Sequence, residues 1–313
     1  MKTNYFCLWA LLLLLNITAF SQNDPLDRAI NLYRSGNFDG AFQEAERVIQ
    51  KIPTYGRAYT LRGQIRKERK DLDGAMADFN KALELNPKDG LASYQRGVIR
   101  SERGDNDGAI SDFDKTIEVA SKIPMVYYNR GLARQAKGDD AGAVPDFTKA
   151  LEVNPQFVDG YYARGLAYQT LNKKPEAIAD YDKCLELKPQ FFEALYNRAG
   201  LRASTGNPDG AIEDYTKAIA INPQDSDCYL YRGLAREGKA EWEAAAGDFS
   251  KVIEMKPQSA DAYLRRGIVR LMQMKDAEAQ SDFDQCLKLD PGMKDSLKAG
   301  IEYAKYQRSR KKK

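Results

Sequence analysis

Arginines and carboxylates recur at a fixed spacing along this 313-residue chain. An arginine stands every 34 residues, and an acidic residue follows each of them 16 positions later. Guanidinium and carboxylate groups that leave water need one another as hydrogen-bonding partners. We therefore predict a structural brace in each repeat, with anion binding by the same arginines as the alternative. The predicted pairs are Arg28–Glu44, Arg62–Asp78, Arg96–Asp112, Arg130–Asp146, Arg164–Asp180, Arg198–Asp214, Arg232–Asp248 and Arg266–Asp282.

A second row of arginines lies four residues after most of the first. Its members are Arg66, Arg100, Arg134, Arg202, Arg236 and Arg270, with Tyr168 at the same position in the fifth repeat. One interpretation gives them acidic partners between neighbouring repeats. The other makes them a basic track for an acidic ligand.

Catalytic chemistry has little support in this sequence. The chain has no histidine, which removes the commonest general base and metal ligand. No CxxC pair, phosphate-binding glycine loop or calcium loop is present. We predict no catalytic, cofactor-binding or metal-binding residue, no cofactor, and no enzymatic activity.

Further markers keep the same 34-residue period and define the elements that carry these residues. Alanine recurs from Ala41 to Ala279, an aromatic residue follows most of these alanines by four positions, and proline recurs from Pro53 to Pro291. In residues 158–191, Tyr161, Gly165 and Tyr168 share one helical face, and a second helix ends near Pro189. Each unit therefore reads as a helical hairpin that buries its apolar face only by stacking on its neighbours.

This pattern resembles the tetratricopeptide repeat (TPR), which pairs a small residue in the first helix with alanine, an aromatic and proline in the second. The resemblance implies an all-α, right-handed superhelical solenoid of eight TPR hairpins with a C-terminal cap helix. The expected organisation is a signal peptide at 1–21, repeats at 22–55, 56–89, 90–123, 124–157, 158–191, 192–225, 226–259 and 260–293, and a cap helix with a basic tail at 294–313. Pro145 falls early in a second helix, which we expect to start late or bend there.

The resemblance also implies a binding surface. In TPR superhelices the concave face is lined by first-helix positions 2, 5, 6, 9, 12 and 13, counted from the first residue of each repeat. Tyrosine and asparagine there suit an extended peptide, although the tyrosines alternatively pack on the next helix. The predicted groove residues are Tyr94, Tyr128, Asn129, Tyr162, Tyr196, Asn197 and Tyr231. The family's carboxylate clamp, with lysine at position 5 and asparagine at position 9, is not matched.

The N-terminus predicts export. Lys2 precedes the apolar run FCLWALLLLL, and small residues follow at Ala19 and Ser21, which is typical of a cleaved secretory signal peptide. We expect a periplasmic or secreted protein with no transmembrane segment after cleavage; an uncleaved signal anchor is the alternative. Cys184, Cys228 and Cys286 are expected to be reduced and mostly buried, with an intermolecular bridge or a reactive role as the alternative.

Charge is unevenly distributed. Residues 294–313 carry a net charge of +6, and without them and Lys2 the solenoid is near −4. A nearly balanced solenoid argues against nucleic-acid binding. The basic tail is interpreted as solvated, with weak contact to anionic surfaces as the alternative.

Together these features predict a non-enzymatic scaffold that binds an extended peptide or protein segment in its concave groove. Two alternatives stay open. One is an envelope-associated adaptor for a glycan or anionic polymer, and the other is a structural, self-assembling spacer.

Overall fold

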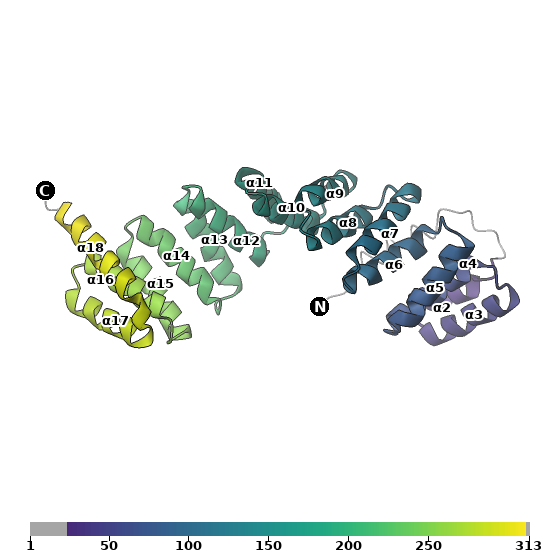
Figure 1. Ribbon diagram of the computed structural model, residues 1–313, viewed down its shortest axis with the longest axis horizontal. Coiled ribbons are helices and arrows are strands. Elements are labelled where there is room, and N and C mark those ends of the chain that lie inside the picture. Colours follow the sequence, from purple (N-terminus) through teal and green to yellow (C-terminus); the bar gives the residue numbers. More distant parts are fainter. Residues whose placement is uncertain (1–23, 311–313) are drawn as a thin grey trace. The chain divides into compact units, whose positions relative to one another are not determined.

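The computed structural model describes residues 24–310, and every regular element in that range is helical (Figure 1). The predicted signal peptide and the last three lysines lie outside the described residues. The chain divides into two compact units at Leu171. The helices of the first unit are α2 (Asp27–Arg34), α3 (Phe38–Lys51), α4 (Gly56–Glu68), α5 (Leu72–Leu85), α6 (Gly90–Glu102), α7 (Asn106–Val119), α8 (Pro124–Ala136), α9 (Asp140–Val153) and α10 (Val158–Thr170).

The second unit begins at Asn172 and continues the alternation of first and second helices. Its helices are α11 (Lys174–Leu187), α12 (Phe192–Ser204), α13 (Pro208–Ile221), α14 (Ser226–Gly238), α15 (Trp242–Met255), α16 (Ala260–Met272), α17 (Asp276–Leu289), the 3-10 turn η1 (Pro291–Met293) and α18 (Lys294–Arg310). Within each unit, consecutive helices pack as hairpins and each hairpin packs on the next. The predicted all-α class and the paired-helix stack are confirmed; α10 and α11, expected to form the fifth hairpin, belong to different units.

The recurring small and aromatic residues explain why the hairpins close. The repeated alanine of every second helix is fully buried, and in α5, α7, α9, α13, α15 and α17 the aromatic residue four positions later fills the space beneath the first helix. At Gly97 an added Cβ would lie 2.9 Å from Phe113, and at Gly131 it would lie 2.6 Å from Phe147. Glycine therefore recurs in the first helix because the ring occupies the volume of a side chain there.

The turn inside each hairpin is determined by local chemistry. Gly104 and Gly138 have positive φ, which glycine adopts at little cost. The side chain of Asp105 then caps α7 by accepting the backbone N–H of Gly108, and Asp139 caps α9 through Gly142 in the same way. These caps start α7 and α9 at the same place in their repeats.

The expected disturbance at Pro145 is wrong. Helix α9 runs without a break from Asp140 to Val153, with Pro145 inside it. Proline removes the hydrogen bond to the carbonyl of Ala141, but Ala141 is exposed, so water can satisfy that oxygen. Asp146 and Phe147 are buried on the opposite side of this turn and hold the helix in place.

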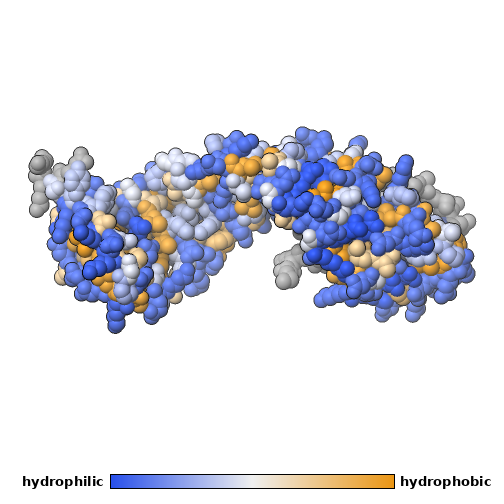
Figure 2. Space-filling model, viewed as in Figure 1, coloured by the Kyte–Doolittle hydropathy of each residue, from blue (hydrophilic) through white to orange (hydrophobic). Residues whose placement is uncertain are grey.

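The C-terminal helix α18 packs on α16 and closes the core of the second unit. Its residues Leu297 and Ala304 are buried with Leu264 and Ile268. Polar residues dominate the visible surface of both units, and apolar residues appear on it as separate patches (Figure 2). Among residues 24–310, no helix combines the length and the apolar character that crossing a membrane requires.

Candidate functional site

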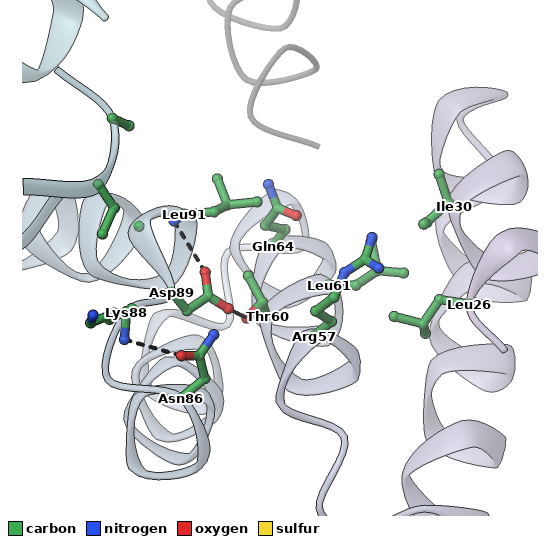
Figure 3. A pocket seen from close by; sticks show the side chains of 13 residues that line it. Leu26, Ile30, Arg57, Thr60, Leu61, Gln64, Asn86, Lys88, Asp89 and Leu91 are labelled. Atoms are coloured by element: carbon green, nitrogen blue, oxygen red, sulfur yellow. Dashed lines mark hydrogen bonds between the residues drawn. The ribbon is translucent and has the colours of Figure 1, made fainter. Parts of the chain in front are cut away.

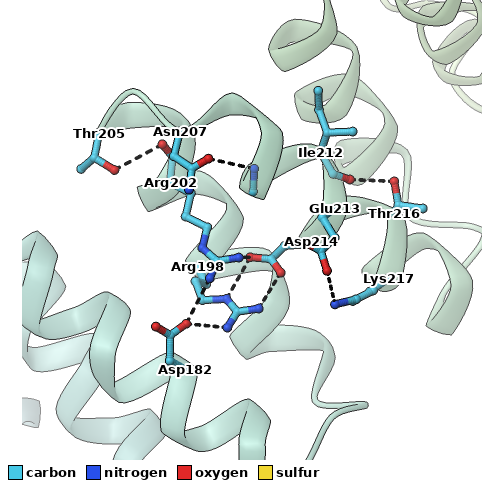
Figure 4. Close-up of polar contacts among 11 residues, drawn as sticks. Asp182, Arg198, Arg202, Thr205, Asn207, Ile212, Glu213, Asp214, Thr216 and Lys217 are labelled. Carbon is cyan, nitrogen blue, oxygen red and sulfur yellow. Dashed lines mark hydrogen bonds and ion pairs between the residues drawn. The ribbon is translucent and has the colours of Figure 1, made fainter.

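The predicted brace is visible as paired hydrogen bonds between the two helices of a hairpin. Arg198 donates from Nε and Nη2 to the two oxygens of Asp214, at 2.9 and 2.6 Å (Figure 4). Six of the seven predicted arginine–aspartate pairs adopt this geometry, the others being Arg62–Asp78, Arg96–Asp112, Arg130–Asp146, Arg232–Asp248 and Arg266–Asp282. Arg164 and Asp180 lie in different units, so that pair stays a prediction. In the first repeat Arg28 lies 3.3 Å from Glu44.

Each brace also reaches the preceding repeat. The Nη1 atom of Arg130 bonds to Asp114, and that of Arg198 bonds to Asp182, each in the second helix of the repeat before. Equivalent contacts join Arg96 to Asn80, Arg232 to Thr216 and Arg266 to Ser250. One guanidinium thus ties a hairpin together and fastens it to its neighbour, which is a structural task rather than ligand binding.

The second row of arginines shares the aspartates of the first. Arg202 donates to Asp214 at 2.9 Å, alongside Arg198 (Figure 4). The same sharing occurs for Arg66, Arg100, Arg134, Arg236 and Arg270 with Asp78, Asp112, Asp146, Asp248 and Asp282. The expectation of acidic partners in neighbouring repeats is therefore wrong as a rule, because the shared aspartate lies in the same repeat. Arg202, which also contacts Asp182, meets it in part.

Tyr94 and Asn129 come together across two neighbouring first helices. The side-chain amide of Asn129 donates to the Tyr94 hydroxyl at 2.9 Å. Tyr94 is buried and packs against Phe113, with ring centroids 6.0 Å apart. Asn129 lines a hollow of about 230 Å³, together with Val98, Ser101, Glu102, Phe113 and Leu132. The hollow lies between α6 and α8, on the face that the first helices form; we refer to this as the first-helix face.

The other groove tyrosines of the first unit are partly covered. Tyr128 packs against Phe147 and edge-on against Phe157, with ring centroids 5.9 and 4.9 Å apart. Burial raises the pKa of Tyr128 to about 12, and the carboxylate of Asp159 adds to the effect. Tyr162 lies half-buried in α10. Part of the side-chain surface of Tyr128 and Tyr162 is used in packing inside the unit. Ligand binding by these two residues stays a prediction.

The predicted residues of the second unit belong to an aromatic cluster. Tyr196 contacts Phe192, Tyr215 and Tyr231, with ring centroids 5.9 to 6.3 Å apart. Burial, followed by the neighbouring Tyr231, raises the pKa of Tyr196 well above its usual range. Tyr231 keeps 41% of its surface exposed, and Asn197 is half-buried on the same helix as Tyr196. The cluster therefore offers one accessible tyrosine on a rigid aromatic base.

A second cavity in the first unit was missed by sequence reasoning (Figure 3). It measures about 220 Å³. The lining residues are Leu26, Ile30, Arg57, Thr60, Leu61, Gln64, Asn86, Lys88, Asp89, Gly90, Leu91, Val119 and Ala120. They come from three successive repeats, so no single repeat carries a signature of the cavity. Arg57, Thr60, Leu61 and Gln64 occupy positions 2, 5, 6 and 9, which places the cavity on the first-helix face.

The acidic and cysteine side chains of the described residues bear on the expectations for metal ligands and thiols. Among residues 24–310, no three histidine, cysteine or acidic side chains lie close enough to hold a metal ion. Cys184, Cys228 and Cys286 are buried and are not joined in a disulfide, as predicted for these thiols. Burial raises the pKa of Cys228 to about 12, with Asp225 adding to the effect.

Family profiles described as the tetratricopeptide repeat match residues 56–89, 126–157, 158–191 and 192–225. No curated protein compared with the chain matches it. Among solved structures, YrrB, a TPR protein with an unusual peptide-binding site, is 21% identical over 62% of this chain and 97% of its own, with a TM-score of 0.56.

Two further structures share the arrangement. MamA is 25% identical over 55% of this chain and 94% of its own, with a TM-score of 0.52. A tetratricopeptide repeat protein from Parabacteroides merdae ATCC 43184 is 19% identical over 83% of this chain and 99% of its own, with a TM-score of 0.51. The profile matches show tetratricopeptide repeats at residues 56–89 and 126–225, and the repeating hairpins share the fold of these solved structures.

Proposed function

We propose that this protein is a non-enzymatic scaffold that holds an extended segment of a partner protein on its first-helix face, in an exported compartment. The observation that carries the proposal is the hollow at Asn129. Its walls combine the apolar side chains of Val98 and Leu132 with the polar groups of Asn129 and Glu102. An extended peptide presents the same mixture, because apolar side chains alternate with backbone amides.

Asn129 is held in a defined orientation for this task. Its Nδ2 is engaged by Tyr94, while its Oδ1 accepts no hydrogen bond from any residue between 24 and 310. An oriented amide oxygen at the edge of an apolar hollow can accept a backbone N–H of the bound segment. Leu132, 36% exposed in the same hollow, supplies apolar contact area.

The second unit supports the same kind of contact. Tyr231 presents both a ring face and a hydroxyl, and its neighbours Tyr196 and Tyr215 restrict its movement. A tyrosine held in this way contributes contact area at a low entropic cost on binding. YrrB supports the proposal as well, since its peptide-binding site lies in a protein of the same fold.

The alternative of a basic track for an anionic polymer has weaker support. All six arginines of the second row donate to a buried aspartate of their own repeat. A polymer would compete with those internal bonds for the same guanidinium groups. The export part of the proposal depends on the leader-like residues 1–21, which fall outside the described range.

The proposal is tested by quantitative capture from an envelope extract with two matched variants. Leu132→Glu places a charge in the hollow, and Ile52→Glu places one on a similarly exposed aliphatic residue outside it. We expect a partner that wild type and Ile52→Glu capture equally and Leu132→Glu loses. Equal capture by all three proteins would contradict a site at the hollow. Capture that salt abolishes and Leu132→Glu leaves intact would favour the anionic polymer.

A further inference from the structure

We propose that the cavity between α2, α4 and α6 binds one large apolar side chain of the partner's segment, with an acidic residue beside it. The inference rests on the proposed function and specifies the chemistry of the partner. The predicted groove tyrosines and the hollow at Asn129 are separate from this cavity and share none of its lining residues.

The walls of the cavity suit an apolar group. Leu26, just before α2, and Ile30 in α2 face it, together with Leu61 from α4 and Leu91 from the start of α6 (Figure 3). A volume of about 220 Å³ exceeds the roughly 150 Å³ of an engineered apolar cavity that accepts benzene. One leucine, methionine or phenylalanine side chain therefore fits.

Gln64 indicates that this apolar group arrives on a peptide backbone. The residue is only 7% exposed and lines the cavity, yet its side-chain amide has no hydrogen bond to any described residue. An extended peptide supplies both missing partners at once, a carbonyl for Nε2 and an N–H for Oε1.

The charges around the cavity specify the neighbouring residue of the ligand. Asp24 is bound by Arg57, at 2.6 Å, and by the Tyr55 hydroxyl. Asp89 accepts from Thr60, at 2.6 Å, and caps α6.

Lys88 is the other charged residue that lines the cavity, and no described residue is paired to its ammonium group. Lys88 is exposed at the cavity, where its ammonium group can pair with an acidic side chain next to the apolar one.

The test is a selection of random ten-residue peptides on protein purified from the full-length gene. Wild type is expected to enrich a large apolar residue adjacent to aspartate or glutamate. Lys88→Glu is expected to enrich the same apolar residue beside lysine or arginine. The matched control is Lys122→Glu, which changes the same position of the next repeat outside the cavity and should select as wild type does.

Two measurements on the best selected peptide follow. Changing its apolar residue to serine should weaken binding about tenfold or more. Gln64→Leu should weaken binding of the peptide several-fold without lowering the thermal midpoint of the unliganded protein, because the Gln64 amide has no hydrogen bond to a described residue that the change would remove. A loss of binding caused by misfolding would lower that midpoint instead.

Selected peptides that lack an apolar residue, or that do not respond to Lys88→Glu, would overturn the proposal. Peptide binding that is unchanged in Lys88→Glu and Gln64→Leu but lost in Leu132→Glu would overturn the proposed role of the cavity. The proposed function would then still stand. Dimerisation that Lys88→Glu abolishes, without peptide enrichment, would assign the cavity to a second copy of the chain. If no peptide is enriched on wild type or any variant, and no partner is captured from the extract, both the proposed ligand of the cavity and the proposed function would be contradicted.

Discussion

The Asn129 amide donates to the Tyr94 hydroxyl at 2.9 Å, which joins the first helices of two neighbouring repeats. Position 5 of one repeat thereby orients position 6 of the next. Tyr94 is too buried to offer much area to a ligand, so the role in binding that we propose for it is to position Asn129.

Tyr94→Phe should therefore weaken partner binding with little loss of stability. Removing one neutral hydrogen bond changes the free energy of unfolding by about 1 kcal/mol. Partner affinity should fall several-fold because the Asn129 amide is no longer held. Titration of the captured partner against Tyr94→Phe and, as control, Tyr59→Phe measures this; equal affinities would remove the positioning role of Tyr94.

Asp112→Asn should destabilise the first unit strongly. Asp112 is fully buried and accepts hydrogen bonds from Arg96 and Arg100, so its neutralisation leaves two guanidinium groups with a weak partner. The expected loss in the free energy of unfolding is about 3 kcal/mol. Asp107→Asn, which removes an exposed partner of Lys137, should cost less than about 1 kcal/mol. Urea unfolding compares the two, and equal costs would refute the brace as a source of stability.

Two glycine-to-alanine substitutions should change the free energy of unfolding in opposite directions. In Gly97→Ala the new methyl group would lie 2.9 Å from Phe113, so we expect a loss of about 1–3 kcal/mol. In Gly247→Ala no atom lies within 4 Å of the new methyl group inside helix α15, so we expect a gain of about 0.5–1 kcal/mol. Thermal unfolding distinguishes these signs. A neutral Gly97→Ala would show that the ring can move aside.

Glu237 should make the second unit less stable as the pH rises. Burial raises the pKa of Glu237, Asp261 raises it further and Arg265 partly offsets the shift. A carboxyl group with a raised folded-state pKa stabilises the fold below its unfolded pKa, and this stabilisation is lost as the pH rises through the folded value. The amide introduced by Glu237→Gln does not ionise, so the stability advantage of this variant should grow as the pH rises above the unfolded pKa of a glutamate, about 4.3, and level off above the folded value.

Thermal midpoints of wild type and Glu237→Gln across this range provide the measurement. The exposed Glu254→Gln variant controls for the loss of one charge. A constant difference between wild type and Glu237→Gln would show that Glu237 ionises alike in the folded and unfolded states.

Features that repeat within one 34-residue unit could be predicted from the sequence. The spacing of Arg62 and Asp78 indicated a bond between two helices, and the contact between Gly97 and Phe113 follows from the same periodicity. The expectation of a late start or a bend at Pro145 failed for two reasons. Asp146 and Phe147 are buried and hold the helix in place, and water can bond to the carbonyl of the exposed Ala141 in place of the N–H that proline lacks.

Features assembled from several repeats could not be predicted in this way. The sharing of Asp214 by Arg198 and Arg202 depends on where two side chains of one helix end in space. The cavity beside Gln64 and Lys88 combines residues of three repeats, and none of them departs visibly from the repeat pattern. Periodicity identifies the scaffold, whereas the individual binding surface arises from residues that vary between repeats.

Site-directed photo-crosslinking in cells tests the binding of a partner segment on the first-helix face most directly. A photoreactive residue replaces Leu132, in the hollow of the first-helix face, or Lys115, exposed on the second helix α7. We predict that position 132 crosslinks to one short segment of a single partner and that position 115 does not. Crosslinks to the same partner from position 115, with none from position 132, would place the binding surface elsewhere and contradict the account.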